Sequence, residues 1–124
     1  MARILIAEDD SDLRLLVSLK LESAGHQVVS VADGSSAAHQ CRVMRPDLVI
    51  LDLMMPGMSG LEVCRFIRSD PELMNTPVIL LTARAQAADI AAGKDAGVDE
   101  YLTKPFSPRE LAGRVDSLLL RVAG

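Results

Sequence analysis

Four short apolar segments of this chain each lead to polar side chains that are suited to phosphate or metal chemistry. The pairs of segment and polar residue are Ile4–Ala7 with Glu8, Asp9 and Asp10, Leu48–Leu51 with Asp52, Val78–Leu81 with Thr82, and Tyr101–Leu102 with Lys104 after Thr103. In a parallel α/β sheet, the crevice that binds ligands lies beyond the carboxyl ends of the strands. If the four segments are parallel strands, these side chains meet in that crevice although they lie far apart in the sequence.

The first segment ends in three consecutive carboxylates, Glu8, Asp9 and Asp10. Like charges this close raise each other's pKa unless a cation or solvent relieves them. Mg²⁺ is suited to such a place, because it usually takes one or two carboxylates, keeps several waters and accepts a phosphate oxygen. The other interpretation is an acidic helix start, since Asp10 and Asp12 would favour the positive end of the helix dipole. It accounts better for Asp10 and Asp12 than for Glu8 and Asp9.

Asp52 directly follows an apolar strand-like segment. A carboxylate there can bind a metal ion or attack phosphorus to give an aspartyl phosphate. The simpler interpretation is a turn residue at a strand end. The irregular stretch Met54–Gly57 comes next, and a backbone carbonyl of such a loop can ligate a cation without help from its side chain.

Thr82 and Lys104 complete the set. A Thr82 hydroxyl can donate to a phosphoryl oxygen, and the Lys104 ammonium can neutralise a carboxylate or a phosphate as a point charge. Taken singly, a β-branched threonine in a strand and a solvated lysine are ordinary features. Their order along the chain and their placement at strand ends make a shared function the better explanation.

The elements that must position these residues alternate regularly along the chain. Strands are expected at 3–7, 27–31, 47–51, 78–81 and 100–102, and helices at 11–24, from Gly34 to Pro46, from Ser59, at 86–96 and from Pro108. Alternating strands and helices predict an α/β fold, and right-handed crossovers place helices on both faces of a parallel sheet. We therefore expect a single doubly wound domain over residues 1–124, with five parallel strands and five helices.

Several local signals make this expectation testable residue by residue. Ser59 and Glu62 have the spacing of a capping box, and Ser107 precedes Pro108 as an N-cap. Gly93 is expected to break the alanine-rich helix at 86–96, which Gly97 ends. The inward stripe of the first helix is expected to contain Leu13, Leu16, Val17, Leu21 and Ala24.

Composition excludes several classes of function. The net charge of -4 argues against nucleic-acid binding by this domain, which would favour a basic surface. No apolar run approaches the roughly 20 residues that span a bilayer, and acids at Glu8 interrupt any secretory apolar region. Cys41 and Cys64 match no metal-ligand spacing, so two buried free thiols in a cytoplasmic protein are expected.

Four stretches together resemble the response-regulator receiver domains of two-component signalling. They are ILIAEDD at 4–10, LDLMMPGMSG at 51–60, PVILLTA at 77–83 and AGVDEYLTKPF at 96–106. The resemblance covers essentially the whole chain. It implies a flavodoxin-like sheet with strand order 2-1-3-4-5 and a cis Lys104–Pro105 peptide bond.

The same resemblance implies a role for each residue of the crevice. Asp52 would be the phosphate acceptor, and Mg²⁺, or Mn²⁺ in its place, would be held by Glu8, Asp9, Asp52 and the Met54 carbonyl, with Asp9 as a direct ligand. Lys104 would bind the phosphate. Thr82 would be the switch hydroxyl and Tyr101 the switch aromatic, which turns inward from an outward or mixed position when Thr82 moves. Met54 and Arg84 would tune the hydrolysis of the acyl phosphate.

The implied reaction moves a phosphoryl group from a sensor histidine kinase or phosphotransfer protein to Asp52. The chain would catalyse only its own phosphorylation and dephosphorylation. The fourth helix, fifth strand and fifth helix would then change shape for a downstream effector or an attached output domain. Residues expected on that face are Ile90, Lys94, Glu100, Glu110 and Arg114.

Many winged-helix transcription regulators resemble the chain near its carboxyl end, and in them charges on this face pair across a dimer. Glu100, Glu110 and Arg114 fit that pattern. Ile90 stands where a basic residue is expected, and Lys94 stands where an apolar residue is usual. We therefore expect a monomer or a weak homodimer that depends on phosphorylation.

Two other classes of function compete with the phosphoacceptor. A phosphatase of the haloacid-dehalogenase type also uses a strand-end aspartate, a threonine, a lysine and an acid pair, but its nucleophile comes first in the chain and a second aspartate follows two residues later. Here the acid pair comes first, and Leu53 and Met54 follow Asp52. A receiver-like scaffold that works without phosphorylation is the other alternative, although every residue that the chemistry needs is present.

Overall fold

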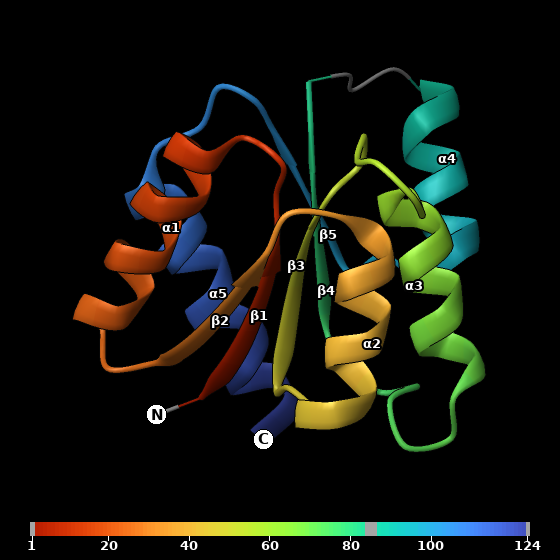
Figure 1. Cartoon of the computed structure of the whole chain (residues 1–124), viewed down its shortest axis with the longest axis horizontal. Coiled ribbons are helices and arrows are strands. Elements are labelled where there is room, and N and C mark those ends of the chain that lie inside the picture. Colours follow the sequence, from red (N-terminus) through yellow and green to blue (C-terminus); the bar gives the residue numbers. More distant parts are fainter. Residues whose placement is uncertain (1, 84–86, 124) are drawn as a thin grey trace.

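Strands and helices alternate strictly in the computed structural model, which describes residues 2–83 and 87–123 (Figure 1). The strands are β1 Arg3–Ala7, β2 Gln27–Val31, β3 Leu48–Asp52, β4 Val78–Thr82 and β5 Glu100–Thr103. The helices are α1 Ser11–Ser23, α2 Gly34–Met44, α3 Gly60–Ser69, α4 Ala87–Ala96 and α5 Pro108–Ala123. These bounds lie close to the expected ones, and β3 is displaced by one residue so that Asp52 belongs to the strand.

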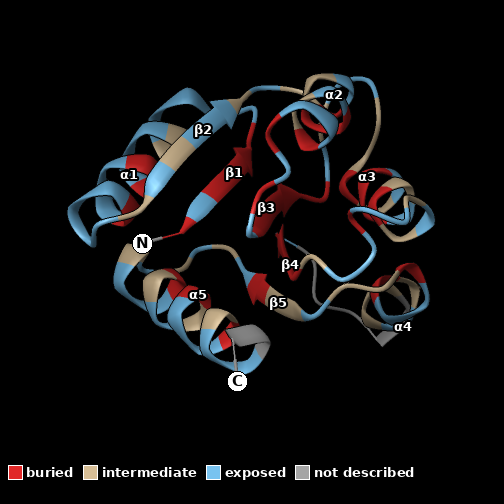
Figure 2. Ribbon diagram, turned by 90° about the horizontal axis from the view of Figure 1, so that it is seen from below, coloured by how far each residue is buried: buried red, intermediate tan, exposed pale blue. Residues whose placement is uncertain are grey.

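All paired strands are parallel, in the order β2-β1-β3-β4-β5. Helices α1 and α5 lie on one side of the sheet, and α2, α3 and α4 lie on the other (Figure 2). The predicted doubly wound α/β fold with strand order 2-1-3-4-5 is thus confirmed. Because the strands are parallel, their carboxyl ends all point to one end of the molecule, the upper end in Figure 1. The helices that connect them cover the two faces of the sheet.

Two apolar cores lie on the two faces of the sheet, because successive side chains of a strand point to opposite faces. Leu5, Val49 and Leu80 belong to the core beneath α2, α3 and α4. Ile4, Ile50 and Ile79 belong to the core beneath α1 and α5. Strands β3 and β4 are buried over their full length, which explains why their sequences are continuous apolar runs rather than alternating ones.

Side chains near the start of three helices bind the free backbone N–H groups there. Asp10 Oδ1 accepts from the N–H groups of Asp12 and Leu13 at 3.0 and 3.1 Å, so the acidic helix start describes Asp10 correctly. Ser59 and Glu62 form the predicted capping box of α3. The Glu110 N–H donates to Ser107 Oγ at 3.0 Å, and α5 begins at Pro108 as predicted.

Two local predictions were wrong. Leu16 is 51% exposed and Ala24 is exposed, because α1 packs through Val17 and Leu21 and leaves its outer side uncovered. Gly93 does not break α4, which runs continuously from Ala87 to Ala96 and ends before Gly97, whose φ is 93°. A glycine weakens a helix only modestly, so packing can keep it helical.

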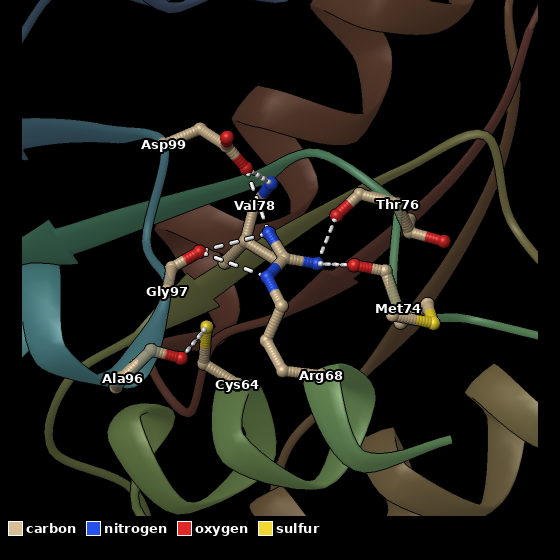
Figure 3. A network of polar contacts seen from close by, with 8 residues as sticks. All are labelled: Cys64, Arg68, Met74, Thr76, Val78, Ala96, Gly97 and Asp99. Atoms are coloured by element: carbon tan, nitrogen blue, oxygen red, sulfur yellow. Dashed lines mark hydrogen bonds and ion pairs between the residues drawn. The ribbon is translucent and has the colours of Figure 1, made fainter. Parts of the chain in front are cut away.

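The amino ends of β4 and β5 are joined by the guanidinium of Arg68, which extends from α3 (Figure 3). It donates to the carbonyls of Met74 and Thr76 on one side, at 3.1 and 2.6 Å, and to the Gly97 carbonyl on the other, at 3.1 Å from Nε and 2.8 Å from Nη2. Its Nη2 also lies 2.8 Å from Asp99 Oδ2, which accepts from the Val78 N–H at 2.8 Å. We call these contacts the Arg68 network.

Both cysteines are free and buried, as expected. Burial raises the pKa of the Cys41 thiol to about 12 and that of the Cys64 thiol to about 11. The Cys64 thiol donates to the Ala96 carbonyl at 3.2 Å. They are therefore packing residues of the core with little thiolate character.

Candidate functional site

The carboxyl ends of β1, β3 and β5 bring Glu8, Asp52 and Lys104 together, as the sequence predicted. Lys104 Nζ lies 2.7 Å from Glu8 Oε1 and 3.2 Å from Asp52 Oδ2. The backbone N–H of Lys104 donates to the Thr82 carbonyl at 2.7 Å, and this bond holds the lysine beside the end of β4. One ammonium thus contacts two carboxylates from different strands.

Asp9 is the third acid of this cluster. One carboxylate oxygen from each of Glu8, Asp9 and Asp52 lies within 4.8 Å of the others. Glu8 and Asp52 are 1% and 5% exposed, whereas Asp9 is open to solvent. Hard oxygen donors grouped in this way fit Mg²⁺, which binds few protein carboxylates and keeps an open side for water or phosphate. The donor chemistry of these residues therefore suits the cation that the sequence suggested.

The electrostatics of the cluster are unbalanced. Burial, helped by the nearby Asp52 carboxylate, raises the pKa of Glu8 from 4.5 to about 7, although Lys104 acts in the opposite direction. Burial opposes the charged form of Lys104, but contacts with Glu8 and Asp52 outweigh it and raise the pKa of Lys104. Slight burial would raise the pKa of Asp9, yet hydrogen bonding to Glu8 and Asp52 lowers it. One lysine is too little positive charge for three acids.

The loop between β3 and α3 packs closely against two glycines, and the sequence did not predict these contacts. A side chain on Gly60 would overlap the Asp52 carbonyl, and one on Gly34 would overlap the Met58 carbonyl. The Gly60 N–H donates to the Leu53 carbonyl at 3.0 Å. The start of α3 therefore approaches the backbone of the proposed acceptor as closely as only glycine allows.

Thr82 and Tyr101, the two residues expected to switch, lie on neighbouring strands β4 and β5. Thr82 is 1% exposed and pairs in register with Thr103. Tyr101 is partly buried, packs against the core beneath α4, and donates its hydroxyl to the Asp89 carbonyl. Its ring therefore lies against α4, whereas the sequence suggested an outward or mixed position for the inactive state.

Charges on β5 and α5 pair within one chain. Arg114 Nη1 lies 3.0 Å from Glu100 Oε2, and Arg114 Nη2 lies 4.0 Å from Glu110 Oε2. On α4, Ile90 is half-buried and Lys94 is exposed. Each of the three charges that fit a charge-paired dimer thus has a partner inside the chain.

Other predicted residues have simpler outcomes. The Met54 side chain is 67% exposed beside the site, and Arg84 lies outside the described residues. The Lys104–Pro105 peptide bond is cis, as the resemblance implied. The part of the chain that the structure describes contains no helix that is both long and apolar enough to cross a bilayer.

Comparison with known proteins agrees with this architecture. A family model described as "Response regulator receiver domain" matches residues 4–116. The DNA-binding response regulator MtrA of Mycolicibacterium smegmatis is 42% identical over 119 residues, which cover 96% of this chain and 51% of that protein. The chain spans about half the length of the curated relatives it matches.

Two solved structures show the same likeness in three dimensions. The Francisella response regulator 1452 receiver domain has a TM-score of 0.91 at 33% identity and covers 98% of this chain and 99% of its own. The receiver domain of sensor histidine kinase PA1611 from Pseudomonas aeruginosa, described "with magnesium ion coordinated in the active site cleft", has a TM-score of 0.83 at 32% identity over 97% of this chain and 95% of its own.

The chain therefore belongs to the response regulator receiver family and is a receiver domain of two-component signalling. Receiver domains are signalling proteins rather than metabolic enzymes. The haloacid-dehalogenase alternative, which already conflicted with the order of the acids along the chain, is not favoured by these relationships.

Proposed function

We propose that this domain is a phosphoacceptor switch that takes a phosphoryl group on Asp52. The observation that carries the proposal is the contact of Asp52, almost fully buried at a strand end, with the Lys104 ammonium and its grouping with Glu8 and Asp9. A buried carboxylate beside a cation and further acids is arranged to react with a phosphorylated donor, since phosphoryl transfer needs mainly positioning and charge compensation.

In the proposed reaction, a carboxylate oxygen of Asp52 attacks the phosphorus of a phosphohistidine on a sensor histidine kinase or phosphotransfer protein. The new O–P bond forms as the N–P bond breaks, and the electron pair of that bond returns to the imidazole nitrogen. Lys104, already 3.2 Å from Asp52 Oδ2, lies close enough to neutralise a phosphoryl oxygen. Water later attacks the same phosphorus, releasing phosphate and restoring the carboxylate.

Glu8, Asp9, Asp52 and the Met54 carbonyl are the proposed ligands of Mg²⁺, or of Mn²⁺ in its place. When bound, such a cation would neutralise charge on the transferring oxygens. Glu8 supports this assignment, because burial and the nearby Asp52 carboxylate raise its pKa and Lys104 offsets them only in part. The magnesium ion named for the PA1611 receiver domain is consistent with it.

The proposed switch connects Asp52 to the face formed by α4, β5 and α5. A phosphoryl group adds charge and acceptor oxygens, which can attract the Thr82 hydroxyl. Tyr101 then redistributes between positions, and the face shifts between states that bind a partner differently. The proposed output residues on that face are Ile90, Lys94, Glu100, Glu110 and Arg114.

The partner of this face is proposed to be a downstream effector or an attached output domain. MtrA is named as a DNA-binding response regulator, whereas the PA1611 receiver domain is part of a sensor histidine kinase. Because Arg114 is paired inside the chain, a charge-paired dimer would first have to exchange those pairs. We therefore propose a monomer that forms at most a weak dimer on phosphorylation.

Acetyl phosphate with Mg²⁺ tests the proposal, with intact-mass measurement of the protein. The expected result is one adduct of about 80 Da that Asp52→Asn abolishes. Asp10→Asn is the matched control, because Asp10 caps α1 and asparagine caps a helix equally well. A folded wild type that gains no adduct would support the phosphorylation-independent scaffold, and repeated turnover of acetyl phosphate without an adduct would indicate a phosphatase.

A further inference from the structure

Helix α4 contains a glycine in its interior, although the helix neither breaks nor ends there. Gly93 lies inside the continuous helix Ala87–Ala96 and is buried. Glycine lowers the stability of a helix interior relative to alanine, so the position needs another explanation.

The explanation lies in the ring that packs against Gly93. A Cβ atom on this residue would overlap the hydroxyl oxygen of Tyr101 and two atoms of its ring. The space that any other side chain would fill is therefore already occupied by Tyr101. Gly113, a glycine inside α5, has open space where its Cβ would lie, so a glycine inside a helix does not by itself imply such packing.

A hydrogen bond of the Tyr101 hydroxyl also holds the ring in this place. The hydroxyl donates to the carbonyl of Asp89, which lies one helical turn before Gly93 on the same side of α4. Burial raises the pKa of the Tyr101 phenol, in agreement with a ring partly withdrawn from water. Ring and hydroxyl together span one turn of α4, from Asp89 to Gly93.

The carboxyl end of α4 is held separately, at the opposite end of the sheet from Asp52. Arg68 donates twice to the Gly97 carbonyl, and the Cys64 thiol donates to the Ala96 carbonyl (Figure 3). Two elements therefore hold α4: the end of α3 holds its last residues, and Tyr101 holds its middle.

We propose that Gly93 is a positioning residue whose missing side chain forms the seat of Tyr101 on α4, so that the seated or unseated ring sets the position of the first turns of this helix. The inference rests on the proposed function only in naming Tyr101 as the switch. It adds that α4 responds to Tyr101 through direct packing at Gly93, while its carboxyl end stays fixed by Arg68 and Cys64.

The chain offers a direct probe of the seat, because Tyr101 is its one tyrosine and it has no tryptophan. Quenching of the intrinsic tyrosine fluorescence by acrylamide reports how open this ring is to solvent. In the unphosphorylated protein, Gly93→Ala should raise the quenching constant at least twofold, because the added methyl displaces the ring. Gly113→Ala is the matched control and should leave it unchanged. Equal quenching in wild type and Gly93→Ala would overturn the proposal.

Thermal unfolding gives a second readout, which can be interpreted even if Gly93→Ala folds poorly. Gly93→Ala should lower the melting temperature by several degrees in the wild type, because the methyl and the ring compete for one space. In a Tyr101→Ala background the seat is empty, so the same substitution should raise the melting temperature, and Gly113→Ala should raise it too. An effect of the same sign in both backgrounds would contradict the seat.

The link to the switch is tested by repeating the quenching after phosphorylation with acetyl phosphate and Mg²⁺, with the adduct counted by intact mass. Phosphorylation should change the quenching of the wild type and of Gly113→Ala, and should change that of Gly93→Ala less than half as much. An equal change in Gly93→Ala would overturn the coupling. Absence of the adduct itself would refute the proposed function, while the seat would still be decided by the unphosphorylated samples.

Discussion

In the described part of the chain, a cation at each end of the sheet joins segments that lie far apart in the sequence, yet the two ends are built differently. At the amino end, the Arg68 guanidinium binds three backbone carbonyls and the Asp99 carboxylate. At the carboxyl end, the Lys104 ammonium contacts two carboxylates, and a third lies close by. The first set of charges is balanced by folding alone. The second remains short of positive charge, as expected of a site that a cation completes.

The difference shows how one sheet can combine a fixed and a responsive end. A planar guanidinium with five N–H donors satisfies several fixed acceptors at once, whereas a lysine ammonium acts as a mobile point charge. Arginine therefore suits the end that should stay in place. Lysine suits the end where ligands exchange and charge changes.

Removing the cation of the amino end should have the largest effect on stability. Arg68→Ala removes the guanidinium from three carbonyls and leaves the Asp99 carboxylate with the Val78 N–H but without its cation, so we expect the free energy of unfolding to fall by about 3 kcal/mol. Urea unfolding followed by circular dichroism measures this. Arg65→Ala, on the exposed side of the same helix, is the control and should change stability little. Equal losses in the two variants would contradict the comparison.

Neutralising one acid at the carboxyl end of the sheet should raise the free energy of unfolding rather than lower it. Because the folded state raises the pKa of Glu8 from 4.5 to about 7, its contribution to stability is present below about pH 4.5 and is lost as pH rises towards 7. Without divalent cations, Glu8→Gln should therefore match the wild type near pH 4.5 and exceed it by about 2–3 kcal/mol at pH 8. Urea unfolding measured across this pH range checks the prediction, and a Glu8→Gln variant less stable than wild type at pH 8 would contradict it.

Supplying the missing charge should stabilise the carboxyl end by a smaller amount. At ten times its dissociation constant, Mg²⁺ should raise the free energy of unfolding by about 1.4 kcal/mol at pH 8. The gain should shrink at pH 5, where Glu8 is protonated. Thermal unfolding with Mg²⁺, against NaCl at equal ionic strength, measures it. Asp9→Asn should lose the gain and Asp12→Asn, an exposed acid inside α1, should keep it; the reverse pattern would refute the proposed ligands.

The smallest effect is expected from the charges on β5 and α5. Arg114 and its partners are partly exposed to water, so Arg114→Ala should change the free energy of unfolding by less than about 1 kcal/mol. Sedimentation equilibrium of the phosphorylated protein gives the second readout. Stronger association in the variant would show that Arg114 is not the residue through which a dimer forms.

The sequence predicted the carboxyl end far better than the amino end. Glu8, Asp52, Thr82 and Lys104 could be brought together because each follows or ends an apolar run, and parallel strands gather their carboxyl ends. Asp10 could be recognised as a helix cap for a similarly local reason. These signals depend on order along the chain and need no knowledge of side-chain packing.

What the sequence did not predict depends on packing between elements. Arg68 looks like any lysine or arginine near the end of an amphipathic helix, and its carbonyl partners carry no signal in the sequence. Gly93 was interpreted as a helix breaker, because the Tyr101 ring that packs against it belongs to β5, a separate element. Leu16 was assigned to the inward stripe, because periodicity gives the direction of a helix face and not how far its neighbours cover it.

The site has one more consequence, for the order of events during synthesis. Glu8 comes from the first strand of the chain and Lys104 from the end of the fifth, so their 2.7 Å contact closes almost the whole chain on itself. A nascent chain that ends before β5 contains the proposed acceptor Asp52 but not Lys104. It cannot assemble the reactive centre until the last strand is in place. Under the proposed function, a copy without this contact should not accept a phosphoryl group, which ties signalling to completed folding.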